Sequence, residues 1–131
     1  MSLLNYGVLI REDDDEWSVT LTDSLGWNVV AESWTWELRF SKSSDRETLV
    51  LSLTAISAVI SGGYAPDFGA NPTMTLLFQM TGAQSASLTP ETHYVDVKAT
   101  EADGTVHFFE PAHGRLVVRD PEGSLGYVEY A

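Results

Sequence analysis

Two of the three histidines in the chain lie six residues apart in TVHFFEPAH, residues 105–113. Together with the carboxylate between them, His107, Glu110 and His113 are residue types that bind a metal ion or transfer protons. A zinc site needs three or four ligands converging at about 2 Å, usually from helical i, i+4 spacing or from adjacent strands. If TVHFFE is a strand, His107 lies on one face, and Glu110 and His113 lie at and beyond its end. The spacing favours two surface imidazoles on a β-hairpin over a metal site.

The acidic run from Glu12 to Glu16 could gather oxygen ligands around a calcium ion. Calcium loops space their carboxylates and include a glycine that lets the backbone wrap the ion. Here five acidic residues are adjacent and no glycine lies among them. We expect a solvated turn between two strands, and the sequence leaves cation binding by this run open.

Nothing else in the sequence predicts catalysis or a cofactor. The chain has no cysteine, which excludes disulfides, thiolate zinc sites and cysteine nucleophiles. It has no GxSxG nucleophile elbow and no GxGxxG or GxxxxGK[ST] phosphate loop. We therefore predict a protein that is not an enzyme and that uses no metal or other cofactor.

The formal net charge is −12. A charge of this size repels nucleic-acid phosphates, so we expect no binding to DNA or RNA. It suits either a well-solvated surface or an acidic face for a basic partner. No apolar run approaches the length of a membrane span, and the N-terminus lacks the features of a signal peptide. We expect synthesis in the cytoplasm, without a signal peptide and without membrane contact.

Alternation of apolar and polar residues runs through much of the chain and predicts strands with one buried face. The clearest strands are EWSVTLT, SWTWELRF, TMTLLFQM and HYVDVKAT. The residues expected to face the core are Trp17, Val19, Leu21, Trp34, Trp36, Leu38, Phe40, Met74, Leu76, Phe78, Met80, Val95, Val97 and Ala99.

Turn signals separate these strands. Asp103-Gly104 is a strong short-range hairpin signal, and TGAQSASL (81–88) predicts one or two helical turns. Many short strands with so little helix predict an all-β sandwich or barrel. We expect a single domain over 1–131, with a strand and the acidic turn in 1–15. The extension 121–131 is expected either to pair with a neighbour's open sheet edge or to fold back onto its own sheet.

Charge is unevenly spread, since Asp67 is the only acidic or basic side chain between Glu47 and Glu91. We favour a central strand pair joined by a loop for this segment. The alternative is a surface covered by another subunit, because large apolar patches usually mark contacts.

Three of the four tryptophans, Trp17, Trp34 and Trp36, share faces with aliphatic residues and are expected in the core. Trp27, beside a glycine in DSLGWN, looks free to be exposed. Aromatic residues of the loops and the tail are further candidates for contact with a partner. The candidate interface residues are Trp27, Tyr64, Phe68, Tyr127 and Tyr130.

The C-terminal half has a recognisable succession of motifs. A strand leads into a short Thr/Gln/Ala-rich turn, followed by a Tyr-x-Asp strand, an Asp-Gly hairpin and a glycine that opens the last strand. The matching positions are Thr81, Gln84, Ala86, Leu88, Tyr94, Asp96, Asp103, Gly104 and Gly114. This succession resembles small immunoglobulin-like domains of tailed-phage and prophage structural proteins, including the N-terminal domain of upper baseplate proteins and related tail-associated modules.

The resemblance implies an immunoglobulin-like antiparallel β-sandwich of about seven to nine strands with at most one short helical turn. It also implies a non-enzymatic structural role in a virion, with other tail proteins and further copies of the chain as partners. Two alternatives remain open. A carbohydrate-binding β-sandwich would expose an aromatic cluster, and an acidic inhibitor or DNA mimic would bind a basic protein in a salt-dependent way.

Overall fold

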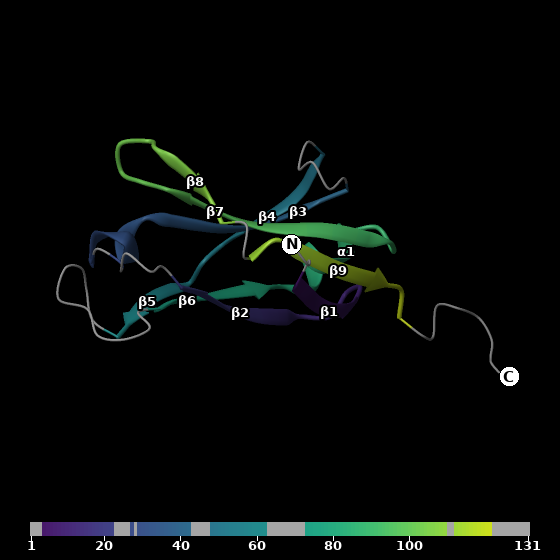
Figure 1. Ribbon diagram of the computed structural model, residues 1–131. Coiled ribbons are helices and arrows are strands. Elements are labelled where there is room, and N and C mark those ends of the chain that lie inside the picture. The colour runs from purple at the N-terminus through teal and green to yellow at the C-terminus, as the bar shows by residue number, and fades with distance from the viewer. Residues whose placement is uncertain are drawn as a thin grey trace, which may run out of the picture.

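The computed structural model describes residues 4–22, 27, 29–42, 48–62, 73–109 and 112–121. Within these ranges, nine strands form two sheets that lie face to face (Figure 1). The strands are β1 (Leu4–Ile10), β2 (Asp15–Thr22), β3 (Thr35–Ser41), β4 (Leu49–Thr54), β5 (Ser57–Ser61), β6 (Thr73–Met80), β7 (Thr92–Thr100), β8 (Val106–Phe108) and β9 (Gly114–Arg119). A 3-10 helix η1 (Val29–Ser33) precedes β3, and a one-turn helix α1 (Gly82–Ala86) follows β6.

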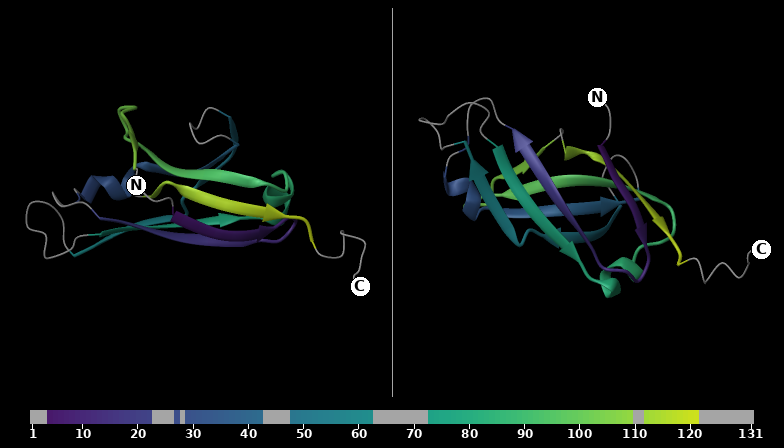
Figure 2. Two further views of the ribbon diagram at one scale, coloured as in Figure 1. Left: turned by 45° about the vertical axis from the view of Figure 1, so that its right-hand side comes forward. Right: turned by 90° about the horizontal axis from the view of Figure 1, so that it is seen from below.

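The strand order is that of an immunoglobulin-like sandwich. The larger sheet runs β1-β9-β7-β3-β4, with β8 also paired to β7, and the smaller sheet runs β2-β6-β5. In immunoglobulin terms, β2, β6 and β5 take the places of strands B, E and D, and β3, β7 and β9 those of C, F and G. β1 pairs with β9 in parallel. Figure 2 shows the two layers from the side and from below. The predicted fold class is confirmed.

The core lies between the sheets and is built from the predicted inward faces. Every residue expected there is buried except Trp34, which lies just before β3 and is half-buried. Burial of one large apolar side chain contributes about 1.5–3 kcal/mol, so the four alternating strands account for much of the stability. Helix α1 falls within the predicted helical range and is held by a capping box between Thr81 and Gln84.

The Asp-Gly hairpin joins β7 to β8 as predicted. Gly104 has a φ of +94°, which a residue without a side chain adopts most readily. The Asp103 carboxylate accepts a 2.9 Å hydrogen bond from the Thr105 N–H. Hydrogen bonds from Thr105, the backbone one first, hold the pKa of Asp103 below its usual value.

The nearly charge-free segment contains the expected strand pair, because β5 and β6 are consecutive and pair antiparallel, but the pair is not central as a whole. Of its strands, only β6 is central, between β2 and β5. β4 and β5 are consecutive in the chain but belong to different sheets, each as an outer strand. Alternation of residue types reports which face of a strand is buried and carries no information on which strands lie beside it.

Candidate functional site

Trp27 is the only predicted interface residue within the described ranges, and the structure corrects its expected exposure. Its side chain is 4 % exposed. The ring centroid lies 6.1 Å from that of Trp36 and 5.9 Å from that of Phe109, so the indole fills one end of the sandwich. The other candidates, Tyr64, Phe68, Tyr127 and Tyr130, lie outside the described residues.

The two histidines of the opening motif lie in different settings. The Nε2 of His107 is 2.5 Å from Oε2 of Glu101, and its ring stacks on Trp34 with centroids 5.2 Å apart. His107 therefore stays partly exposed on the hairpin. His113 is half-buried like His107, but its Nε2 atom is shielded from solvent, so the expected surface imidazole is only partly exposed. Beside it, the Leu4 N–H donates to the His113 carbonyl. Glu110 lies outside the described residues.

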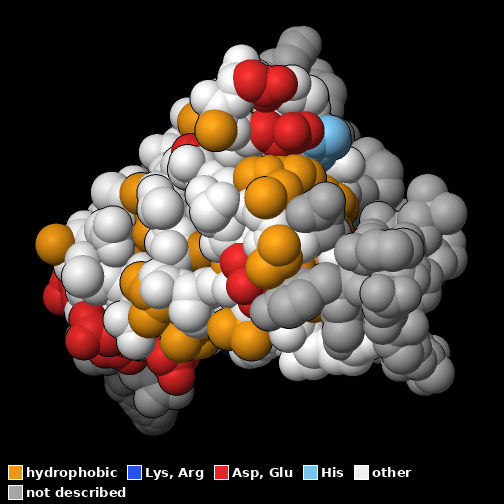
Figure 3. Space-filling view, turned by 90° about the vertical axis from the view of Figure 1, so that its left-hand side faces the viewer, with side chains coloured by type: hydrophobic (Ala, Val, Ile, Leu, Met, Phe, Trp, Pro, Cys, Tyr) orange, Lys and Arg blue, Asp and Glu red, His pale blue; other side chains and the backbone are white. Residues whose placement is uncertain are grey.

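Figure 3 shows this end of the sandwich as a surface. Apolar side chains lie among acidic groups and one imidazole, and no Lys or Arg side chain is visible among the coloured residues. Trp34 stacks on Trp36, with centroids 5.9 Å apart, as well as on His107. The aromatic rings here pack mainly on one another.

The acidic run forms the predicted turn between β1 and β2, but two of its residues also hold helix α1. Oδ1 of Asp14 accepts a 2.6 Å hydrogen bond from the Gly82 N–H, and the Glu12 N–H donates to Oγ of Ser85 at 2.8 Å. Across the described ranges, no group of three or more His, Cys, Asp or Glu side chains is placed to hold a metal ion. One carboxylate of this turn, that of Asp14, therefore holds the first residue of α1.

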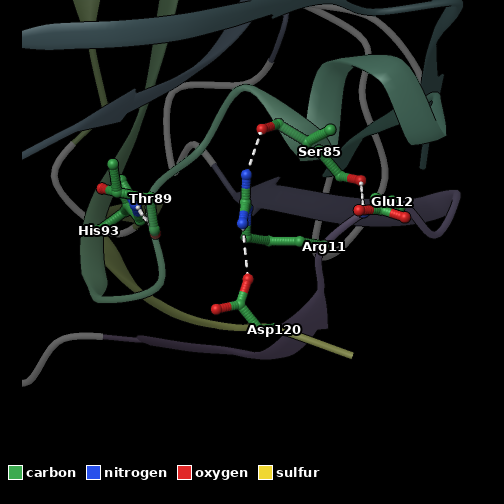
Figure 4. Close-up of polar contacts among 7 residues, drawn as sticks. Arg11, Glu12, Ser85, Thr89, His93 and Asp120 are labelled. Atoms are coloured by element: carbon green, nitrogen blue, oxygen red, sulfur yellow. Dashed lines mark hydrogen bonds and ion pairs between the residues drawn. The ribbon is translucent and has the colours of Figure 1, made fainter. Parts of the chain in front are cut away.

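Arg11 joins three elements at the same corner (Figure 4). Its Nη1 lies 2.6 Å from Oδ1 of Asp120, after β9, and its Nη2 donates to the Ala86 carbonyl at 2.8 Å. Sequence reasoning missed this contact. The available signal was that Arg11 is the only basic residue before Arg39 and lies beside the acidic run.

Asp96 is a second feature that the sequence did not predict. Alternation places it on the outer face of β7, yet it is only 2 % exposed. Nε of Arg39 lies 3.9 Å from its Oδ1. β9 pairs with β7 only up to Val95, and β8 pairs only from Lys98 onward. Asp96 thus lies where the chain crosses from β8 to β9.

Tyr6 closes the same region from β1. Its hydroxyl donates a 2.5 Å hydrogen bond to the Ala112 carbonyl. Burial, and after it the negative charge of Asp96, raises the pKa of Tyr6 well above its usual value. The phenol therefore stays neutral and remains a hydrogen-bond donor across the physiological pH range.

Outer strands expose backbone groups that can pair with another chain, and most proteins protect them. β1 contains a bulge between Asn5 and Val8, with Gly7 at a φ of +95°. In β5, the Ile60 N–H donates to the carboxylate of Glu32 at 2.8 Å. These two edges are therefore poor templates for an added strand.

The outer edge of β4 is different. The Ala55 N–H donates to the Trp36 carbonyl, so the backbone groups of Ala55 point toward β3. Because these groups alternate in direction along an antiparallel strand, those of Ser52 and Thr54 point away from β3. Apart from an irregularity near Leu49, the strand is regular. No charged residue occurs between Thr48 and Gly62, and no described residue hydrogen-bonds to these outward backbone groups. We call Ser52, Thr54 and their neighbours in β4 the β4 edge, and it is the candidate interaction site.

The sequence matches no model of a protein family, and no curated protein aligns with it significantly. No helix in the described part of the chain is long and apolar enough to cross a membrane.

Proposed function

We propose that this chain is a non-enzymatic structural protein of a bacteriophage or prophage particle, associated with the tail or the baseplate. It is made in the host cytoplasm, joins the virion, and acts through contacts with other tail proteins and with further copies of itself. The observation that carries the proposal is the β4 edge, the outer side of a strand that pairs only with β3 among the described residues and lies in a charge-free segment of a strongly acidic protein.

An unpaired, uncharged strand edge is the feature to which a neighbouring strand adds by main-chain hydrogen bonds. In a chain with a net charge of −12, such a segment lets an equally acidic neighbour approach without like charges facing each other. The sequence resemblance to phage structural modules supports the same role. The sugar-binding alternative needs free aromatic faces, whereas the described tryptophan rings pack against other rings.

The direct test is mass spectrometry of particles purified from the induced source strain. We expect the polypeptide at stoichiometric level in intact particles. A polypeptide that is abundant in the lysate and missing from particles would overturn the virion role.

A matched pair of variants tests the surface itself. Thr54→Lys places a charge on the β4 edge, and Ala102→Lys places the same charge on the exposed β7–β8 turn. We expect Thr54→Lys to fold normally but to be depleted from particles, while Ala102→Lys is incorporated like the parent chain. Equal incorporation of both variants would show that the β4 edge is not the contact.

A further inference from the structure

The β4 edge offers regular backbone geometry at two residues, Ser52 and Thr54. Each directs one N–H and one carbonyl away from β3, and β4 pairs with no other strand within the described residues. Leu53, between them, directs its backbone groups toward β3 and its side chain into the core. Before Leu51 the register shifts. A partner strand therefore finds regular geometry only around Leu53.

This short edge is complementary to itself. Consider a second copy that approaches antiparallel about a two-fold axis at Leu53. Ser52 of each copy then lies opposite Thr54 of the other, as a hydrogen-bonded pair of an antiparallel ladder. Every outward N–H and carbonyl of these two residues gains a partner in both copies. A two-fold contact uses the same surface on each subunit, so the assembly closes with two copies.

The charges beside the edge are complementary in the same register. On β3, Glu37 is paired with Thr54, and the next outward residue, Arg39, is paired with Ser52. With the axis at Leu53, Glu37 of each copy lies level with Arg39 of the other. An axis at Ser52 would place the two Arg39 residues level and would extend the pairing into the irregular start of β4. The charges are about three strand spacings apart, roughly 14 Å, so they favour one register without forming ion pairs.

The same pairing covers apolar side chains at the end of the larger sheet. Leu51 packs against the core but is only partly buried, because no described strand follows β4. In this register Leu51 lies opposite Ala55 of the second copy. Ile56, directly after β4, is 57 % exposed, and the start of β4 in the second copy runs past it. The contact therefore removes apolar surface from water at both ends of the paired segment.

We infer that a second copy of this chain occupies the β4 edge, with the two β4 strands antiparallel about a two-fold axis at Leu53. The larger sheets of the two molecules then form one continuous sheet. This inference rests on the proposed function, in which the β4 edge is the contact surface, and names the partner. One short strand per molecule is a small contact beside the roughly 1,200–2,000 Å² of stable interfaces. The free dimer is therefore weak, and the high local concentration inside a particle favours it.

Cysteine cross-linking between two single variants tests the register, because the natural chain has no thiol. Purified Ser52→Cys and Thr54→Cys proteins are incubated alone and mixed, at equal total concentration, in a glutathione buffer that reverses disulfides that do not fit. A disulfide needs Cα atoms about 4.4–6.8 Å apart. Opposite residues of a hydrogen-bonded pair lie about 5.5 Å apart, whereas the two copies of Ser52, or of Thr54, are diagonal neighbours at about 7–8 Å. The control mixes Thr54→Cys with Ala102→Cys, on the exposed β7–β8 turn.

We expect about tenfold more disulfide-linked dimer in the mixture than in either variant alone or in the control. Its intact mass should correspond to one chain of each variant. A dominant dimer in Ser52→Cys alone would overturn the axis at Leu53. If both variants have the melting temperature of the parent and the mixture gives no more dimer than the control, the second copy is not the partner.

Sedimentation of proteins without cysteine gives a second readout. The parent chain should form a dimer in proportion to its concentration, Ala102→Lys should behave like the parent, and Thr54→Lys should stay monomeric. Equal association of all three would overturn the inference. Failure of the proposed function is distinguishable, because a chain that cross-links as expected but is missing from purified particles would refute the virion role alone. A chain that is present in particles and does not cross-link there would refute the second copy alone.

Discussion

The carboxylate of Glu32 accepts a 2.8 Å hydrogen bond from the backbone N–H of Ile60. Ile60 lies in the outer strand β5, and this N–H would otherwise be available to a strand from another molecule. Glu32 belongs to η1, so the short helix before β3 protects the edge of the other sheet. One side of the sandwich therefore has a blocked edge in β5 and an open one in β4.

Replacing Glu32 by Ala should destabilise the protein and promote association. A hydrogen bond to a charged group typically contributes about 1.5–3 kcal/mol, and we expect a loss near the lower end because the site is only partly buried. Urea unfolding measures the loss, and light scattering measures the association. Asp13→Ala, at an exposed turn position, is the control and should change neither. A Glu32→Ala protein as stable and as monomeric as this control would contradict the assignment.

Tyr6 should make the protein sensitive to alkaline pH. Its pKa is raised in the folded state, while an unfolded tyrosine loses its proton near pH 10. Above that pH the unfolded chain binds fewer protons than the folded one, so stability falls as pH rises, by up to about 1.4 kcal/mol per pH unit.

The Tyr6→Phe variant separates this effect from the hydrogen bond to Ala112. At pH 7 it should be less stable than the parent by about 1 kcal/mol, because the hydrogen bond is lost. The difference in the free energy of unfolding should shrink between pH 10 and pH 11, because only the parent chain has Tyr6 and loses stability as the unfolded tyrosine loses its proton. Urea unfolding across this range measures it, and a constant difference would mean that Tyr6 does not stay protonated in the fold.

Replacing Asp96 should lower the free energy of unfolding more than replacing most other polar residues. Removing one partner of a buried ion pair typically costs about 3–5 kcal/mol, so Asp96→Ala should approach that loss in chemical unfolding. A double-mutant cycle with Arg39→Met gives the part that belongs to the pair. A loss no larger than that of Asp13→Ala would show that Asp96 is solvated in solution.

Trp36 is the aromatic residue whose removal should cost most. It is 1 % exposed, contacts Trp27 and Phe109, and donates its indole N–H to the Ala31 carbonyl at 2.8 Å. Trp36→Ala should lower the free energy of unfolding by about 3–5 kcal/mol, as for other buried aromatic residues. A change below about 1 kcal/mol would place the ring in solvent and revive the sugar-binding alternative.

Sequence reasoning succeeded where the relevant interactions are local. The inward faces of β2, β3, β6 and β7 follow from a period of two, and the β7–β8 hairpin follows from two adjacent residues, Asp103 and Gly104. These signals depend on neighbours within a few positions, so they can be read without knowing the topology.

It failed where burial depends on segments far apart in the chain. Trp27 is covered by Phe109, and Asp96 is buried where β8 gives way to β9. The β4 edge could not be recognised either, because a strand becomes an outer strand only through the order of the whole sheet. The sequence thus showed that the segment containing the β4 edge lacks charge, but it did not show that the outer side of β4 is unpaired.

The parallel pairing of β1 with β9 has a consequence for biosynthesis. These strands lie near opposite ends of the sequence, and β9 is the only sheet partner of β1 in the described structure. At roughly 5–20 residues per second, a ribosome needs on the order of 5–20 s to make the hundred or so residues between them. During that time β1 emerges without its partner. The larger sheet is completed only once nearly the whole chain has left the ribosome, so incomplete nascent chains expose apolar surface to chaperones.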